Sequence, residues 1–340
     1  MKRTGHAWER LSDEQLLKLR LCDLHLHLPS SRLRAPLDRL YAELASRGIR
    51  FRPHVWFAEE WFSPDGVAGF AVPFYLAHPR LTRLEKRYTH EAEGSNRNWL
   101  MRILRHEAGH ALDSAYRLRR RARWRALFGP ASSRYPTQYR ARPGSRRHVQ
   151  HLGEWYAQAH PAEDFAETFA VWLKPRSDWR RRYADWPARH KLEFVAEAAE
   201  QMRRERPAVR QRLLIEPLSE NTRTLEQHFR RKLARRLRLR RPLADRLLRR
   251  AFRSDRPARW PRPAAALLRA HRTELLASVI RRSHADRYAA QQLLRLAIER
   301  CEFLDLYVRG SSALALRRAR ATLVRLAKAY ATSEGLGWRL

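Results

Sequence analysis

Apolar and polar residues alternate along this chain in patterns that predict mostly helices. Over residues 100–115, apolar side chains recur at intervals of three and four, which places them on one face of a helix. We expect this helix to begin near Asn96 and to continue to Gly129, where a Gly-Pro pair ends it. A second helix is expected from Pro161, because proline suits the first turn of a helix, and Pro175 closes it.

The first third of the chain mixes helical and extended patterns. These patterns predict two helices followed by two strands, at residues 12–21, 36–47, 51–57 and 67–78. A turn at residues 63–66 (Ser-Pro-Asp-Gly) joins the two strands. Pro73 indicates that the second strand lies at an edge of its sheet, because proline has no N–H to donate.

Beyond about Glu216 the pattern becomes almost continuously that of amphipathic helices. It is broken near four prolines: Pro242, Pro257, Pro261 and Pro263. The length of 340 residues is enough for two domains. We therefore expect an α+β domain at residues 1–210 and an all-α, basic domain at residues 216–340.

The distribution of charge identifies a candidate segment for binding a negatively charged partner. The chain has 71 Lys and Arg against 35 Asp and Glu, a net charge of +36. A field this positive attracts nucleic acid or anionic membranes, although the basic residues are spread over most of the chain, as on a solvated surface. The segment from Arg230 to Arg262 is denser, with fifteen basic residues and two acidic ones, and is a candidate contact for nucleic acid or an acidic partner.

Other features exclude whole classes of protein. The two cysteines, Cys22 and Cys301, are far apart, which excludes a cysteine zinc site and a disulfide framework and is typical of a reducing compartment. The first residues lack the apolar stretch of a secretory signal, and no apolar run is long enough to span a bilayer. We therefore expect a cytoplasmic protein.

The long predicted helix carries the sequence HEAGH at residues 106–110. Residues four apart lie on the same face of a helix, so His106 and His110 can bind one zinc ion. Glu107, one step round, can reach water at the metal without being a ligand. Gly109 is a poor helix former, and its presence makes sense if another backbone packs closely against this helix. The alternative is a structural helix with two incidental histidines.

A catalytic zinc has three protein ligands and one open position. The metzincin arrangement requires glycine and histidine where this chain has Asp113 and Tyr116, so that arrangement is excluded. Glu163 and Glu167 lie one turn apart on the downstream helix, where one carboxylate can bind the metal and the other can accept an N–H from a ligating histidine. Two neighbouring residues are alternatives for the third ligand: Asp164 and His160.

The combination of HEAGH with the downstream sequence HPAEDFAETFA resembles the gluzincin zinc peptidases. It is more closely similar to a bacterial family described as putative zinc-binding metallopeptidases. The resemblance covers most of residues 8–205, including FRPHVWFAEEWFSPDGVAGFAVPFYLAHPRL, RHEAGHALDSAYRL and WYAQAHPAEDFAETFAVWL. It implies a zincin-like catalytic domain with a small sheet and a long HExxH helix.

The resemblance also implies a role for each site residue. The metal ligands that it implies are His106, His110 and Glu163. Glu107 is then the general base, and Glu167 takes the position beside the ligands where related enzymes carry Asp or Glu. Tyr156 lies seven residues before Glu163, as a tyrosine does in gluzincins similar to anthrax lethal factor, and is either a catalytic phenol or a packed aromatic. Asp113 either supports a ligating histidine or is a solvated charge.

These observations predict a zinc-dependent metallopeptidase that acts on peptides or proteins. Glu107 would take a proton from zinc-activated water and pass it to the leaving amine, while zinc and Tyr156 stabilise the oxyanion. The strand at residues 67–78 would bind an extended peptide along its edge. The alternatives are a basic nucleic-acid-binding protein and a zinc-binding regulatory protein without catalytic activity.

Overall fold

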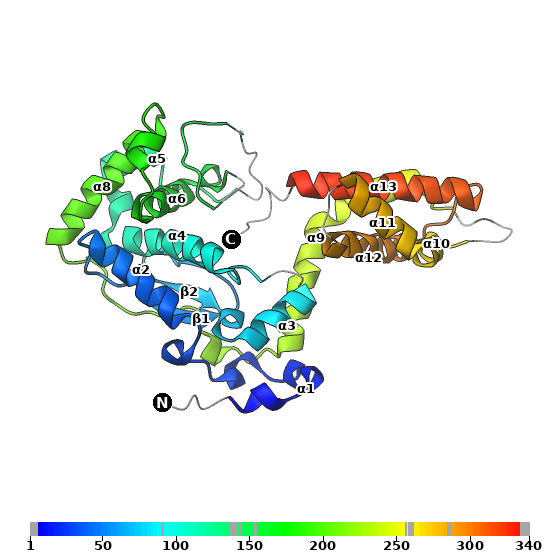
Figure 1. Ribbon diagram of the computed structural model, residues 1–340, viewed down its shortest axis with the longest axis horizontal. Helices are drawn as coiled ribbons and strands as arrows, with labels where there is room; N and C mark the ends of the chain where they lie inside the picture. The colour runs from blue at the N-terminus through cyan, green and yellow to red at the C-terminus, as the bar shows by residue number, and fades with distance from the viewer. Residues whose placement is uncertain are drawn as a thin grey trace. The chain divides into compact units, whose positions relative to one another are not determined.

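The computed structural model describes residues 6–89, 92–136, 142, 144–152, 155–255, 257, 262–283 and 287–333 (Figure 1). The chain divides into two compact units, the first extending to Phe229 and the second beginning at Arg230. Each unit has its own core of buried apolar side chains.

The first unit is mostly helical. Its α-helices are α1 (Asp13–Leu17), α2 (Arg34–Ser46), α3 (Pro79–Thr89), α4 (Arg97–Tyr116), α5 (Ala122–Phe128), α6 (Pro161–Leu173), α7 (Trp179–Arg182) and α8 (Ala188–Arg204). Its 3-10 helices are η1 (Ala7–Arg10), η2 (Leu21–Leu24), η3 (Leu28–Ser30), η4 (Phe74–Ala77), η5 (Leu118–Arg120), η6 (Tyr156–Gln158) and η7 (Leu218–Glu220). The expected helix at residues 12–21 is therefore much shorter, while α2 and α6 lie close to their expected positions.

The small sheet contains two strands, β1 (His54–Ala58) and β2 (Gly69–Pro73). They run parallel, with His54 opposite Gly69 and Ala58 opposite Pro73. On the other side of β2, the N–H of Ala71 donates to the carbonyl of Phe62 at 2.8 Å in an antiparallel bridge. β2 therefore lies at an edge of the two-stranded sheet, as Pro73 predicts, but the bridge to Phe62 occupies that edge at Ala71.

Helix α4 lies in the middle of the first unit (Figure 1). It packs against α6 on one side and against α2 and β2 on the other. Inside this packing, the guanidinium of Arg105 donates to both carboxylate oxygens of Glu43 at 2.6 and 2.7 Å, and both side chains are buried. The ion pair ties α4 to α2, and such a buried pair holds two elements firmly because neither charge has water to replace its partner.

Helix α4 ends earlier than the apolar pattern predicts. Arg117 has a left-handed backbone, with φ of 50°, and closes the helix with its N–H on the carbonyls of Asp113 and Ser114. The carboxylate of Asp113 then accepts the backbone N–H of Arg119 at 2.8 Å. The expected continuous helix from Asn96 to Gly129 is therefore α4, η5 and α5 in succession, because this capping turns the chain.

The second unit is built from helices within the described residues. After α9 (Leu225–Ala251), which begins in the first unit, come α10 (Ala264–Ala270), α11 (Arg272–Ser283), α12 (Arg287–Phe303) and α13 (Ser312–Ser333). The expectation of a break at Pro242 is wrong, because α9 continues through it. None of the described helices is both long and apolar enough to cross a membrane.

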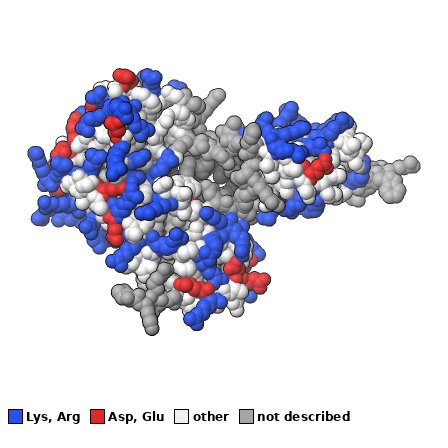
Figure 2. Space-filling view, viewed as in Figure 1, with Lys and Arg blue, Asp and Glu red and all other residues white. Residues whose placement is uncertain are grey.

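Basic side chains cover much of the visible surface of each unit (Figure 2). Acidic side chains are interspersed with them on the first unit and are sparser on the visible face of the second. On the visible face of the first unit, the described basic side chains are therefore mixed with acidic ones, as on a solvated surface.

Candidate metal centre

Helices α4 and α6 lie close together at Gly109. A Cβ atom at this position would lie 2.9 Å from the Cα of Ala166 and 3.2 Å from the Cβ of Phe169. Real Cβ atoms do not approach backbone this closely, so a side chain here would push the helices apart. This contact confirms the expectation that another backbone packs against the HEAGH helix.

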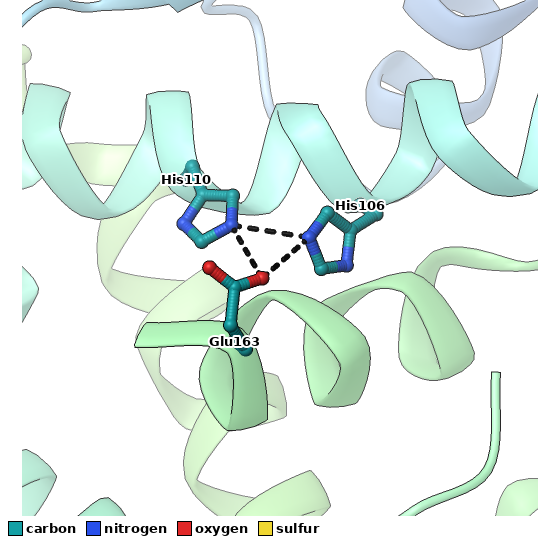
Figure 3. Close-up of side chains that lie close together, drawn as sticks. All are labelled: His106, His110 and Glu163. Carbon is teal, nitrogen blue, oxygen red and sulfur yellow. Dashed lines mark hydrogen bonds and ion pairs between the residues drawn. The ribbon is translucent and has the colours of Figure 1, made fainter. Parts of the chain in front are cut away.

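The close approach brings together three side chains from the two helices (Figure 3). The Nε2 atoms of His106 and His110 are 3.1 Å apart. Oε2 of Glu163 lies 2.9 Å from the first nitrogen and 3.3 Å from the second. All three side chains are buried, and together they form a group that can hold a metal ion.

The spacing of these atoms fits zinc. A tetrahedral zinc ion with ligands at about 2.0–2.2 Å holds its donor atoms about 3.3–3.6 Å apart. The three atoms here are 2.9 to 3.3 Å apart, so outward movements of a few tenths of an ångström bring them to that geometry. Two imidazole nitrogens and one carboxylate oxygen also form a donor set found in catalytic zinc sites.

Glu167 orients the ring of His106 from the other side. Its Oε1 lies 3.1 Å from Nδ1 of His106, and its Oε2 accepts the backbone N–H of Leu152 at 2.9 Å. With Nδ1 held in this way, Nε2 of His106 points to Glu163. Burial lowers the pKa of His106, but the hydrogen bonds to Glu163 and Glu167 outweigh burial and raise the pKa to about 10. A metal ion must therefore displace a proton from this ring.

The two oxygens of Glu163 have different partners. Oε2 faces the two histidines, whereas Oε1 accepts the phenol O–H of Tyr135 at 3.1 Å. Burial alone would raise the pKa of Glu163, but the charges and hydrogen bonds of both histidines lower it well below its ordinary value. Glu163 is therefore a carboxylate at neutral pH, as a metal ligand must be.

Residues 84–182 match the family described as "Putative zinc-binding metallo-peptidase". This match confirms the predicted family resemblance. The matched segment contains the whole HEAGH sequence and Glu163, so it includes the three donor side chains. Comparisons with curated proteins and with solved structures gave no significant match.

Glu107 follows His106 on α4, beside the group of three side chains. It is buried, and its Oε2 accepts the hydroxyl of Ser63 at 2.8 Å. Ser63 lies in the connection between β1 and β2, so this connection reaches α4 at the position where the sequence places a general base.

Tyr156 also lies beside the group. Its ring centroid is 5.6 Å from that of His106, and its side chain is buried. Burial and the nearby carboxylate of Glu163 raise the pKa of Tyr156 well above its ordinary value. Its phenol therefore keeps its proton.

The other predicted residues have partners elsewhere. The carboxylate of Asp113 is buried and binds both the backbone N–H and the Nε of Arg119, at 2.8 and 2.7 Å. Asp164 pairs with Nζ of Lys191 at 2.5 Å. Both ring nitrogens of His160 are engaged, Nδ1 with the N–H of Ala162 and Nε2 with the carbonyl of Ser133. The structure therefore groups Glu163, and neither of its two alternatives, with the histidines.

Sequence patterns do not predict the contacts that Tyr135 and Ser63 make at the site. Tyr135 precedes Glu163 by 28 positions, and Ser63 precedes Glu107 by 44, so no helical spacing connects either pair. Ser63 belongs to the segment that the sequence predicts to be a turn. The basic segment from Arg230 to Arg262 lies in part outside the described residues.

Proposed function

We propose that this protein is a zinc-dependent metallopeptidase whose first unit is a zincin-like, gluzincin-type catalytic domain. The observation that carries the proposal is the convergence of His106, His110 and Glu163 on one point between two helices. The family match supports the class of reaction, since its description names a zinc-binding metallo-peptidase. The expected substrate is a peptide or protein.

In this proposal, His106, His110 and Glu163 hold zinc, and Glu167 keeps the ring of His106 in place. Zinc in such a site supplies Lewis-acid activation of water and of the scissile carbonyl. Glu107 is the general base, which takes a proton from the attacking water and passes it to the leaving amine. The hydroxyl of Ser63 holds this carboxylate in one orientation.

Tyr156 is proposed to stabilise the oxyanion. An oxyanion requires hydrogen-bond donors aimed at the developing charge. The raised pKa of Tyr156 keeps its phenol protonated throughout the neutral range, so the group can donate. Its ring lies beside His106, next to the proposed metal position.

The direct test compares the wild type with Glu107→Gln. The substitution keeps the size of the side chain but removes the base. We expect one zinc per chain in both proteins by elemental analysis, and we expect new peptide termini from a proteome digest only with the wild type. A chelator should abolish the cleavage and added zinc should restore it. Equal cleavage by both proteins would exclude Glu107 as the base, and zinc binding without cleavage by either would favour a silent zinc-binding protein.

A second candidate function is nucleic-acid binding by the second unit. Residues 230–334, which form this unit, contain 28 basic and eight acidic side chains, so they carry +20 of the net charge of +36. The apolar faces of its helices are buried in its core, which leaves charged groups at the surface. Such a surface suits phosphate contacts more than insertion into a membrane.

If the second unit binds nucleic acid, the full chain should bind duplex DNA. The affinity should fall steeply as the salt concentration rises. Charge reversal at Arg281, Arg282, Arg317 and Arg318 should reduce both the affinity and the salt dependence. The same reversal at four exposed arginines of the first unit should have a smaller effect: Arg180, Arg181, Arg203 and Arg204. Equal losses from both sets would indicate attraction by net charge alone.

A further inference from the structure

Tyr135 contacts the one oxygen of Glu163 that does not face the histidines. Its phenol donates to Oε1 at 3.1 Å, while Oε2 lies 2.9 Å from His106 and 3.3 Å from His110. We propose that Tyr135 is a positioning residue that makes Glu163 bind the metal through Oε2 alone. The inference rests on the proposed zinc site and names a residue outside the HExxH-plus-glutamate pattern.

This contact affects the way in which the carboxylate of Glu163 can bind a metal. A carboxylate can bind a metal through one oxygen or through both. A hydrogen bond to Oε1 occupies that oxygen and sets the rotation of the carboxylate plane. Glu163 would then occupy a single coordination position of a bound zinc ion, and a further position would stay open for water or substrate.

Tyr135 is itself held in place by the beginning of α6. Its ring stacks on that of His160, with centroids 3.7 Å apart and planes at 17°. The ring of His160 is fixed at both nitrogens: Nδ1 accepts the N–H of Ala162 at 3.1 Å, and Nε2 donates to the carbonyl of Ser133 at 2.9 Å. The helix that carries Glu163 therefore also carries the support for the phenol that orients it.

The position of Tyr135 agrees with this role. Tyr135 is 46% exposed, whereas Glu163 is 1% exposed, so the phenol reaches the carboxylate from the solvent side. The phenol O–H is a hydrogen-bond donor, as the contact requires.

The test is the zinc affinity of Tyr135→Phe, measured by competition with a chromophoric chelator. This substitution removes the hydroxyl but keeps the ring that stacks on His160. We expect zinc affinity to fall about 10- to 100-fold, the range observed when a group that supports a metal ligand is lost. Thermal stability without zinc should change little. The matched control is Tyr41→Phe, which removes a phenol that donates to the carbonyl of Pro53, far along the chain from the site.

A double-mutant cycle separates a direct effect from a general one. In a Glu163→Ala background, Tyr135→Phe should cause no further loss of zinc affinity, because its partner is already absent. Zinc affinity of Tyr135→Phe within twofold of the wild type, or an equal loss in Tyr41→Phe, would overturn the inference. Failure of the wild type to bind zinc would instead overturn the proposed function, so the two failures are distinguishable.

Discussion

The carboxylate of Glu107 has its partner in a segment that is remote in sequence. HExxH spacing places this residue beside the metal ligands, but the spacing alone leaves the carboxylate free to rotate. In the structure, the hydroxyl of Ser63 donates to Oε2 of Glu107 at 2.8 Å. The neighbouring Phe62 is tied to β2 through Ala71, so the hydroxyl is held by the sheet. A single serine thus couples the sheet to the proposed base.

Ser63→Ala is expected to lower the rate of peptide hydrolysis without loss of zinc. The base would remain but would lose its orientation, and the positioning of a catalytic group is worth about tenfold or more in rate. The measurement is kcat on a cleaved peptide, together with zinc content. Ser46→Ala serves as the control, because its hydroxyl contacts a carbonyl of α2. An unchanged kcat in Ser63→Ala would show that Glu107 needs no such support.

The identity of the third donor was only partly predictable from the sequence. Three neighbouring residues can each bind metal: His160, Asp164 and Glu163. Their positions on the helix decide between them, because each successive residue turns by about 100°. Glu163 and Glu167 share the face toward α4, while Asp164 turns to Lys191. Tyr135 and Ser63 were not predictable, because their contacts depend on how distant segments pack.

At the scale of elements, the site depends on the distance between α4 and α6. The two helices touch at Gly109, one residue from His110, so the glycine sets how near the two histidines come to Glu163. The apolar stripe of the HEAGH helix and the proline start of α6 made both helices predictable. The end of α4 was not predictable, because it depends on the left-handed backbone of Arg117 and on the contacts of Arg119 with Asp113. The parallel pairing of β1 and β2 was also not predictable, because a turn sequence between two strands suggests a hairpin, in which the strands are antiparallel.

Gly109→Ala is expected to destabilise the protein and to weaken zinc binding. In an exposed helix this change stabilises by about 1 kcal/mol. Here the new methyl group would lie 2.9 Å from the backbone of Ala166, so the helices must separate. Overpacking of this kind costs about 1–3 kcal/mol. The checks are the free energy of unfolding in urea and zinc affinity by chelator competition. A gain in stability with unchanged zinc affinity would show that the helix contact is not tight.

At the scale of the whole chain, the stability of the first unit should depend on pH, because the unit contains partly buried charged groups. Glu59 follows β1, and its carboxylate binds the ring of His228 at 2.9 Å and the guanidinium of Arg223. Burial would raise the pKa of Glu59, but these two partners outweigh burial and lower the pKa to about 2. The network joins the strand region to the beginning of α9. Nothing in the sequence pattern predicted the pairing of Glu59 with His228, which lies 169 positions further along the chain.

The stability that Glu59 contributes should be lost in acid. A group with a lowered pKa stabilises the folded state above its unfolded pKa, near 4.5, and loses that contribution as the pH falls to about 2. Allowing for solvent screening, we expect Glu59→Gln to lower the free energy of unfolding by about 1–2 kcal/mol at pH 7. The difference from the wild type should shrink between pH 5 and about pH 2. Urea unfolding across this range measures it, with the exposed Glu14→Gln as control. A difference that stays constant with pH would contradict this account.

The most direct test of the central claim is the position of zinc in the folded protein. Crystals grown with one equivalent of zinc would be measured on both sides of the zinc absorption edge. The account predicts one anomalous peak about 2.0–2.2 Å from Nε2 of His106, Nε2 of His110 and Oε2 of Glu163. A zinc peak bound by other residues, or no peak between α4 and α6 in protein that contains zinc, would contradict it.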